Sequence, residues 1–420
     1  MRRRALACLM ISTFLAMSAL AAQPSGKPLP GQIIVNPKNP AWFVRYDPKG
    51  NHKPFFLCGP GDPEGFLYRG KRRADGTRDG DQRKLIKKLA PTGANGIYLM
   101  AVRSHGGDGD RSHNPFVNND PKKGLNAKVL GQWERWFDAM DRAGIVIYFF
   151  LYDDSARIWN TGHRVGEAER KFIHGLAKRF KHHKNLIWCV AEEYQERFSA
   201  KRVSAIAAEI RKADEHHHPI AVHKLSGLSF KEFADNPNLD QFAVQYNVKS
   251  PEVLHAGAVK AFREAKGRYN LNMSEVAQHG KGRTARLMSW AAAMGGAYVM
   301  VLRMDIAGTA KADLEDCGRL VRFFESTDVA EMAPHDELAA ADTQYVLAKP
   351  GRSYIAYSAR RVGRIGLKDM TAGTYDFTWL DGATGKRVEQ RAVQVAAGEQ
   401  AWPPPAGIGK EVALYVRRTK

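Results

Sequence analysis

The sequence predicts an α/β fold, a (β/α)8 TIM barrel followed by a small antiparallel β-sandwich. Apolar runs alternate with segments of helical periodicity about eight times before residue 335, which is the pattern of a barrel of parallel strands. Several of these runs end abruptly in charged residues. After about residue 335 no helical period remains, and short alternating runs separated by turn residues follow, as in an antiparallel sandwich.

The units of the expected barrel share one pattern. Helical segments end at glycines such as Gly93 and Gly144, because glycine readily takes the left-handed conformation that stops a helix. A continuous apolar run then follows, as expected for a strand that is covered on both faces. A hairpin with its turn at residues 47–51 precedes the first barrel strand. The expected strands are 54–58, 96–102, 145–151, 186–190, a run ending at His223, 241–246, 269–273 and AYVMVLRMD.

The tail has the turn chemistry of a small all-β domain. Its alternating runs are separated by Lys349-Pro350-Gly351, Ala372-Gly373 and Asp381-Gly382, and such turn residues between short runs indicate antiparallel strands. We therefore divide the chain into a leader at 1–21, a barrel domain at 22–335 and a C-terminal β-sandwich at 336–420.

The leader has the features of a cleaved signal peptide. Three arginines at positions 2–4 precede an apolar stretch that ends in Ala19-Leu20-Ala21, which is a small-residue cleavage signature. An uncleaved anchor is the alternative, and the shortness of the apolar run counts against it. We expect an exported protein, periplasmic or extracellular, with no membrane span once the signal is removed.

Charge and cysteine content restrict the partners and the redox chemistry. The formal net charge is +20, and removal of the leader arginines leaves about +17. This charge fits an anionic partner such as an acidic polysaccharide, or simply solubility. Nucleic acid is not expected, because no zinc finger, RNP-like motif or basic helix accompanies the charge. The mature chain keeps Cys58, Cys189 and Cys317, an odd number without the spacing of a disulfide framework.

Two stretches deliver carboxylates to the expected active end of the barrel. NLIWCVAEEY runs from an apolar strand directly into Glu192 and Glu193, and Glu275 follows the expected strand 269–273. The C-terminal ends of barrel strands form the face where active sites lie. Hydrolysis of a glycosidic bond needs one carboxylic acid to protonate the leaving oxygen and one carboxylate to attack or stabilise the anomeric carbon. The alternative is that these are solvated charges at strand ends.

Other polar residues close the same strands and are candidates for substrate binding. They are Arg103, Asp153, Asp154, Glu192, His223, Tyr246 and Arg303. Arg103 or Tyr246 would also serve to keep a nucleophilic Glu275 ionised. Structural roles remain open for several of them, namely helix capping for the aspartates, a hydrogen-bonded core position for His223 and core packing for Tyr246.

The sequence predicts no metal site and no cofactor. The histidine runs at 182–183 and 216–218 lack the spacing of metal ligands. There is no phosphate-binding loop, dinucleotide fingerprint or nucleophile elbow.

The chain resembles the apiosidase-like glycoside hydrolases of the clan A barrel type, in which a β-domain labelled collagen-binding follows the barrel. The resemblance covers nearly all of the mature chain, and its matching pieces are KPFFLCG, WERWFDAMDRAGIVIYFFLYDD, NLIWCVAEEYQE, NLNMSEVAQHG, RLMSWAAAMGGAYVM, YVLAKPGRSYIAYSA and DFTWLDGATGKRV. It implies that Glu193 is the acid/base, that Glu275 is the nucleophile and that the anomeric configuration is retained.

The chain departs from the family pattern at two places. Glu192 stands where the Asn of the usual Asn-Glu pair contacts the sugar 2-hydroxyl, so it either alters substrate recognition or leaves open which glutamate is the acid. The loop Gly59-Pro60-Gly61-Asp62 replaces the usual Gly-Asp-Thr, which puts one wall of the substrate site in doubt.

The leading hypothesis is a secreted glycoside hydrolase that acts on a polysaccharide or oligosaccharide. The alternative is a non-catalytic carbohydrate- or matrix-binding protein on the same barrel, because a fold does not by itself imply activity. A third, nucleic-acid or envelope binding through basic residues, predicts steep salt dependence and indifference to loss of either glutamate. The sugar, the linkage, endo or exo action, the role of the tail and the oligomeric state are not set by the sequence.

Overall fold

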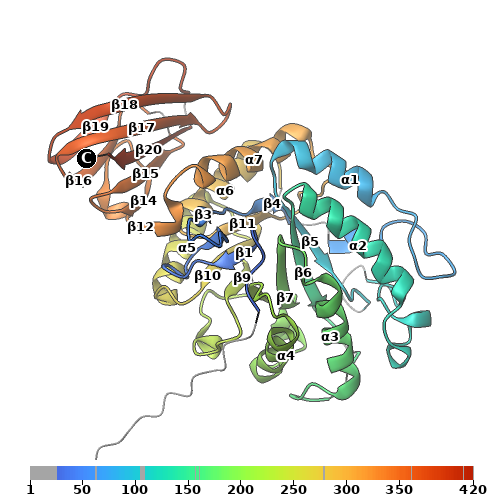
Figure 1. The fold of residues 1–420 in the computed structure, drawn as a ribbon. Helices are drawn as coiled ribbons and strands as arrows, with labels where there is room; N and C mark the ends of the chain where they lie inside the picture. The colour runs from blue at the N-terminus through green and yellow to red at the C-terminus, as the bar shows by residue number, and fades with distance from the viewer. Residues whose placement is uncertain are drawn as a thin grey trace, which may run out of the picture.

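The structure is a computed structural model that describes residues 26–61, 64–104, 109–156, 158–159, 161–277, 280–360, 362–409 and 411–419. The predicted signal peptide at 1–21 and Asp62 lie outside the described residues. Figure 1 shows the barrel, surrounded by helices, with the C-terminal β-domain beside it.

Eight parallel strands form the barrel and confirm the predicted fold class. Their order around the sheet is β4-β11-β10-β9-β8-β7-β6-β5, and each neighbouring pair runs parallel. The strands are β4 (Cys58–Pro60), β5 (Gly96–Met100), β6 (Val146–Tyr152), β7 (Leu186–Ala191), β8 (Ile220–Lys224), β9 (Gln241–Gln245), β10 (Asn270–Val276) and β11 (Tyr298–Val301).

In the part of the chain that the structure describes, seven α-helices cover the outside of the barrel. They are α1 (Gln82–Leu89), α2 (Ala127–Arg142), α3 (Glu167–Phe180), α4 (Ala200–Ala213), α5 (Pro251–Ala265), α6 (Gly282–Met294) and α7 (Lys311–Glu325). Several helices have side-chain N-caps: Asn126, Ser199 and Ser250 each accept a hydrogen bond from a backbone N–H of the first turn. Short 3-10 turns lie at Glu64–Tyr68, Ala90–Thr92, Val117–Asn119, Pro121–Lys123, Tyr194–Glu196, Lys231–Phe233, Val329–Glu331 and Asp336–Leu338.

The barrel closes between β4 and β5 through Asn95 and two glycines. The Asn95 side chain accepts a hydrogen bond from the Cys58 N–H and donates one to the Phe56 carbonyl, at 3.0 and 2.7 Å. A Cβ on Gly59 would stand 2.8 Å from the backbone nitrogen of Gly96. Glycine therefore allows the first and second barrel strands to approach closely.

The first barrel strand begins later than the sequence suggested. Residues 54–58 were expected to form it, but β4 starts at Cys58. Pro54 belongs to β3 (Lys53–Pro54), which extends an antiparallel sheet of β1 (Ile33–Val35) and β2 (Phe43–Arg45). The apolar run is thus divided between this N-terminal sheet and the barrel, and hydrophobicity alone does not show the division.

The tail forms two antiparallel sheets, as predicted. Their orders are β12-β14-β15-β20-β17-β18 and β13-β16-β19. The strands are β12 (Ala333–Pro334), β13 (Ala339–Ala341), β14 (Tyr345–Lys349), β15 (Ser353–Ser358), β16 (Ile365–Met370), β17 (Gly373–Asp381), β18 (Arg387–Val395), β19 (Gly398–Trp402) and β20 (Val412–Arg418).

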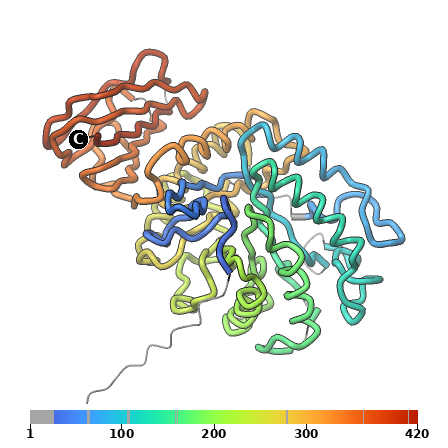
Figure 2. Tube along the Cα trace, in the orientation of Figure 1, coloured from blue at the N-terminus to red at the C-terminus, as the bar shows by residue number. Residues whose placement is uncertain are grey.

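The tail packs directly on the barrel helices, next to α6 in Figures 1 and 2. Trp290 of α6 stacks on Tyr357 of β15 with ring centroids 4.6 Å apart. Beside this stack the buried carboxylate of Glu411 accepts hydrogen bonds from Arg283 at 2.9 Å and from Arg286 at 2.6 and 3.0 Å. An apolar stack and a buried ion pair together fix the two domains against each other.

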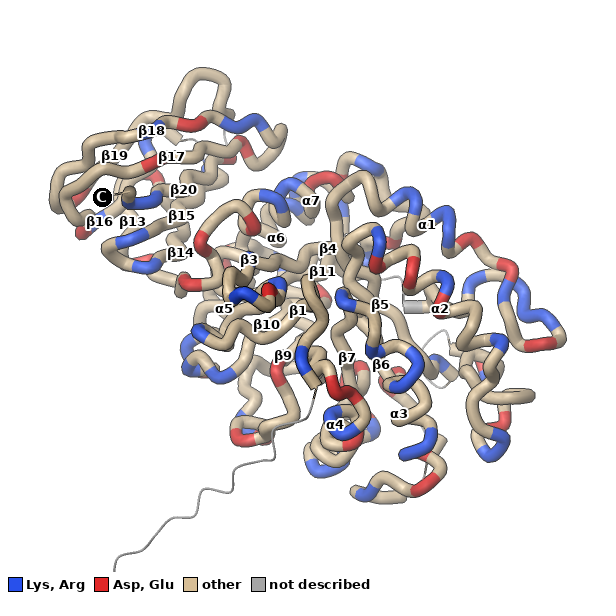
Figure 3. Tube along the Cα trace, in the orientation of Figure 1, with Lys and Arg blue, Asp and Glu red and all other residues tan. Residues whose placement is uncertain are grey.

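The three cysteines of the described chain, Cys58, Cys189 and Cys317, are free and buried, which agrees with the expectation of no disulfide framework. Basic and acidic residues alternate along the outer helices rather than gathering in one block (Figure 3). Among the described residues, every helix is too short or too polar to cross a membrane.

Loss of the Glu411 carboxylate should weaken the contact between the tail and the barrel. We expect Glu411→Ala to lower the free energy of unfolding by about 2 kcal/mol, because Arg286 keeps its bond to Asp316 but loses its buried partner in the tail. Urea unfolding of the full chain measures this. Glu399→Ala, at an exposed position of β19, is the control and should change little. Equal stability of Glu411→Ala and wild type would show that the ion pair does not hold the interface.

Candidate active site

The end of β7 presents two adjacent glutamates to the C-terminal face of the barrel. Glu192 and Glu193 follow Ala191 directly and are buried, with 6% and 9% of their surface exposed. Glu193 has φ 36° and ψ 47°, which is the left-handed region that a non-glycine residue rarely adopts. Such strain is concentrated at functional sites, where the surrounding structure enforces it.

A bulge in β10 directs Glu275 into the barrel. The pairing register of β10 shifts against β9 between Met273 and Glu275, and against β11 between Met273 and Val276. In a regular strand, alternate residues share a face, so Asn270 and Asn272 would share a face with Ser274. The extra residue of the bulge re-aims the next side chain, and the buried Glu275 reaches the site.

The structure brings Glu193 and Glu275 together around His223. One carboxylate oxygen of each glutamate and a ring nitrogen of His223 all lie within 4.8 Å of one another. His223 Nε2 is 3.8 Å from Glu275 Oε1. Residues from β7, β8 and β10, far apart in the sequence, therefore form one compact group at the rim.

The hydrogen bonding of His223 fixes its tautomer. Its Nδ1 accepts the backbone N–H of Glu193 at 3.0 Å, so in the neutral ring the proton must be on Nε2. Burial lowers the pKa of His223 to about 3, so the ring is neutral at ordinary pH. The Nε2–H faces the Glu275 carboxylate and supplies a fixed dipole beside it.

Glu192 has a different environment. Its Oε1 accepts a hydrogen bond from the Tyr98 hydroxyl at 3.4 Å, and its Oε2 is 3.8 Å from Nη1 of Arg103. Arg103 and Tyr98 are buried. Arg103 therefore lies next to Glu192, and Tyr98, which the sequence analysis did not name, contacts the same carboxylate.

The structure corrects the assignment of Tyr246. Its ring lies against helix α5, where a Cβ on Gly257 would stand 2.5 Å from the Tyr246 ring. Its neighbour Gln245 instead donates a hydrogen bond from Nε2 to Glu275 Oε2 at 2.6 Å. Successive side chains of a strand point to opposite faces, and Gln241 already points inward, bonded to Tyr148 and Asn270. Gln241 and Gln245 are four residues apart and so share a face of the strand, which is the sequence signal that could have identified Gln245.

The remaining predicted residues lie along the same rim in unequal settings. Asp153 is buried directly after β6. Asp154 is half-buried, and its carboxylate lies within 4.8 Å of those of Glu193 and Glu196. Arg303 follows β11, is exposed and has φ 59°. Asp154 is thus adjacent to the pair, whereas Arg303 lies on the solvent side.

Glu193, His223 and Glu275 are close enough to be considered as metal ligands. The tautomer of His223 argues against that interpretation. A ligating nitrogen must offer its lone pair, but Nε2 carries the proton while Nδ1 accepts the Glu193 N–H. The chemistry available to this group is that of two carboxylates and a neutral hydrogen-bond donor.

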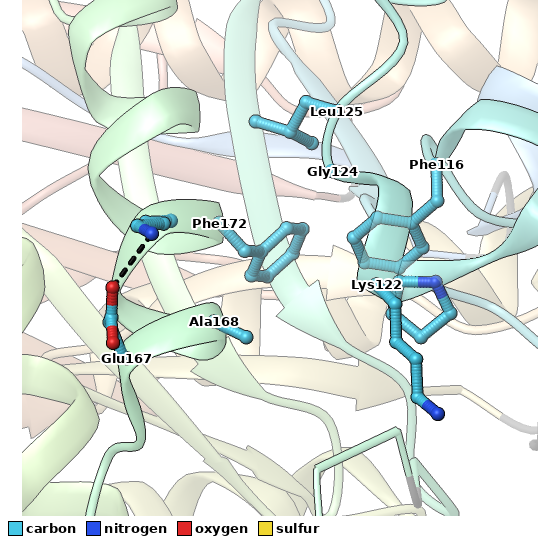
Figure 4. Close-up of a pocket in the computed structure, with 9 residues that line it drawn as sticks. Phe116, Lys122, Gly124, Leu125, Glu167, Ala168 and Phe172 are labelled. Carbon is cyan, nitrogen blue, oxygen red and sulfur yellow. Dashed lines mark ion pairs between the residues drawn. The ribbon is translucent and has the colours of Figure 1, made fainter.

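A separate cavity of about 530 Å³ lies beside the rim, between the loop at 116–125 and the start of α3. Figure 4 shows Phe116 and Lys122 of the loop opposite Phe172 and Glu167 of α3, and Glu167 forms an ion pair with Lys171. None of the predicted site residues lines this cavity.

The buried neutral state of His223 predicts pH-dependent stability. The unfolded ring takes up a proton below about pH 6.5 and the folded ring only below about pH 3, so stability falls as the pH falls through this window. Between pH 7 and pH 5 we expect the wild type to lose about 2 kcal/mol more than His223→Gln. Urea unfolding at both pH values measures this difference, and equal losses would contradict the neutral state.

Solved structures share the architecture of the chain. A glycoside hydrolase family 5 structure from Bacteroides vulgatus matches with a TM-score of 0.67 at 13% identity, over 93% of this chain and 94% of that one. A β-mannanase from the blue mussel Mytilus edulis matches with a TM-score of 0.51 at 15% identity, over 71% of this chain and 98% of that one. At such identities the likeness shows the fold. No curated protein sequence matches the chain.

The family itself is shown by the sequence. The pattern of the apiosidase-like catalytic domain matches residues 49–298, which is more than half of the chain and includes every barrel strand up to the start of β11. The chain therefore belongs to the apiosidase-like family of glycoside hydrolases, and its barrel is the catalytic domain.

Proposed function

We propose that the protein is a secreted, retaining glycoside hydrolase in which Glu193 is the acid/base and Glu275 the nucleophile. The observation that carries this proposal is the separation of the two carboxylates, whose oxygens lie within 4.8 Å at the C-terminal face of the barrel. Retaining glycosidases hold their carboxyl groups about 5–5.5 Å apart, whereas inverting enzymes need roughly 6.5–9.5 Å to admit a water molecule. The short separation favours direct attack by a carboxylate.

The reaction would proceed in two steps. In the first, Glu193 gives its proton to the glycosidic oxygen while Glu275 attacks the anomeric carbon, so the leaving alcohol departs and a glycosyl ester forms on Glu275. In the second, the ionised Glu193 takes a proton from water, the water oxygen attacks the anomeric carbon, and Glu275 is released. Two inversions give net retention.

Two neighbours prepare Glu275 for its role. Gln245 donates a hydrogen bond to one carboxylate oxygen, and the Nε2–H of His223 faces the other at 3.8 Å. Hydrogen-bond donors favour the charged form of a carboxylate and hold its orientation. Glu275 is therefore suited to act as the ionised nucleophile.

The acidic rim bears on the substrate class. Glu192 is ion-paired with Arg103, while Glu193, Glu275 and Asp154 add carboxylates within a short distance. Like charges repel strongly in a partly buried site, so we propose a neutral sugar at the cleaved position. Any acidic group of the substrate would lie away from the rim. Glu192 would accept hydrogen bonds from sugar hydroxyls, in the place where the related Asn acts.

The family name supplies the first substrate to test, a glycoside of apiose. We further propose that residues 1–21 direct export, which would place the enzyme where polysaccharides and oligosaccharides are found.

Loss of either catalytic carboxylate should remove activity while the fold persists. We expect Glu193→Gln and Glu275→Gln to lower kcat by about 10³ or more on a panel of aryl glycosides and polysaccharides, because each removes an essential group. Glu167→Gln is the matched control, since Glu167 is exposed on α3 and forms a surface ion pair with Lys171. Its activity should equal that of the wild type.

Equal hydrolysis by the wild type and both variants would move the chemistry away from this pair. NMR of the first product formed would show the anomer released, and net inversion would contradict the proposed mechanism. Sugar binding without hydrolysis on every substrate would favour the non-catalytic alternative.

The hydrogen bond from Gln245 should also contribute to catalysis. A bond to a charged group is worth about 1.5–3 kcal/mol, so we expect Gln245→Leu to lower kcat about 10- to 100-fold. Tyr246→Phe is a matched control on the adjacent residue, whose ring packs on α5, and should stay within about twofold of wild type. A loss in Tyr246→Phe with full activity in Gln245→Leu would reverse this assignment.

A further inference from the structure

We propose a binding site for a divalent transition-metal ion at Glu134, Asp138, His182 and His183. One ligand atom of each residue lies within 4.8 Å of the others. The site lies at the N-terminal end of β7, because His182 and His183 come just before Leu186, where that strand begins. It is therefore at the opposite end of the strand from Glu193.

The fold brings together two pairs of ligands that are separate in the sequence. Glu134 and Asp138 are four residues apart on α2 and so lie on one face of that helix. His182 and His183 follow the end of α3 at Phe180. A groove of about 640 Å³ between the two helices is lined by three of the four residues, Glu134, Asp138 and His182, and gives an ion access from solvent.

The distances suit coordination of a single ion. Glu134 Oε1 is 2.9 Å from Nε2 of His182 and 2.9 Å from Nε2 of His183. Ligand atoms placed about 2.0–2.1 Å from one ion in a tetrahedral arrangement stand roughly 3.3–3.4 Å apart, so the side chains need to separate by only a few tenths of an ångström. Without an ion, the two rings can donate N–H groups to the same oxygen. With an ion, the ring protons shift to Nδ1 and each Nε2 offers its lone pair.

The His183 ring is buried among carboxylates that attract a cation. The carboxylates of Glu134, Asp138 and Asp141 face the ring and contribute negative charge. Lys178 and Arg179 also line the groove and oppose a cation, so we expect moderate rather than very tight affinity.

Surrounding hydrogen bonds hold the ligands in place. Arg179 Nε contacts Glu134 Oε2 at 2.5 Å and leaves Oε1 for the ion. His218 contacts the His183 carbonyl through Nε2 at 3.0 Å, and its Nδ1 is bonded to Asp214 at 2.9 Å. Such outer contacts orient ligands in metal sites.

The donor set indicates the class of ion. Two imidazoles with two carboxylates suit Zn²⁺, Ni²⁺ or Cu²⁺, whereas Mg²⁺ and Ca²⁺ prefer oxygen ligands alone. An ion here would connect α2 to the segment between α3 and β7. Its effect would be on the stability of the barrel, independent of the hydrolytic site.

Zinc binding to the full chain, without a histidine tag and after removal of metal by chelator, tests the proposal. Calorimetry with ZnCl₂ should give one ion per chain, and the same ion should raise Tm. We expect His182→Ala and Glu134→Gln each to weaken binding at least about tenfold, because each removes a ligand. His174→Ala is the matched control, since this histidine on α3 contacts Glu209 instead.

The Glu193→Gln variant tests whether zinc binds instead at Glu193, His223 and Glu275. We expect it to bind zinc as the wild type does. Failure of the wild type to bind one zinc ion per chain would overturn the proposal. So would full binding by His182→Ala, or loss of binding in Glu193→Gln with retention in His182→Ala.

Discussion

The hydrogen bond from the Glu193 backbone N–H to Nδ1 of His223 determines the character of the catalytic group. It places the ring proton on Nε2, and that proton faces Glu275. The bond requires the strand to stop and turn at Glu193, whose left-handed backbone directs both the N–H and the side chain. One strained residue thus aligns the proposed acid/base, while the ring it contacts helps to align the proposed nucleophile. This gives a physical reason for the strain, since relief of it would move both carboxylates.

The cost of this arrangement is stability at low pH. A histidine held neutral inside a barrel takes up its proton in the folded state only below about pH 3, whereas the unfolded chain takes it up below about pH 6.5. The interior around it is aromatic, with Tyr98 and Phe150 both 6.1 Å from the ring. The same low-polarity surroundings strengthen the electrostatic effect of the Nε2–H on Glu275. The stability at low pH and the interaction of His223 with Glu275 therefore both depend on the burial of His223.

The sequence was sufficient for the fold and for the ends of the central strands. A continuous apolar run identified β7, the short run 269–273 indicated β10, and both glutamates lie at the C-terminal ends of these strands, as expected. Details that depend on a single residue of register could not be predicted with the same success. A bulge is a local change of strand pairing, so the amino-acid sequence around Glu275 does not reveal it. Similarly, a shift of one residue in the register of β9 decides whether Gln245 or Tyr246 points to Glu275. The group at His182 required the packing of α2 against α3, which no local pattern contains.

The adjacent glutamates of β7 can be told apart by their charges. Arg103 lies beside Glu192 and favours its ionised form, so Glu192 is suited to accept hydrogen bonds and not to release a proton. Glu193 shares its site with the carboxylate of Glu275 and a ring that stays neutral. A single proton shared between two such carboxylates relieves their repulsion. In the mechanism that we propose, that proton belongs to Glu193, the acid of the first step, while Gln245 and His223 direct their donors to Glu275.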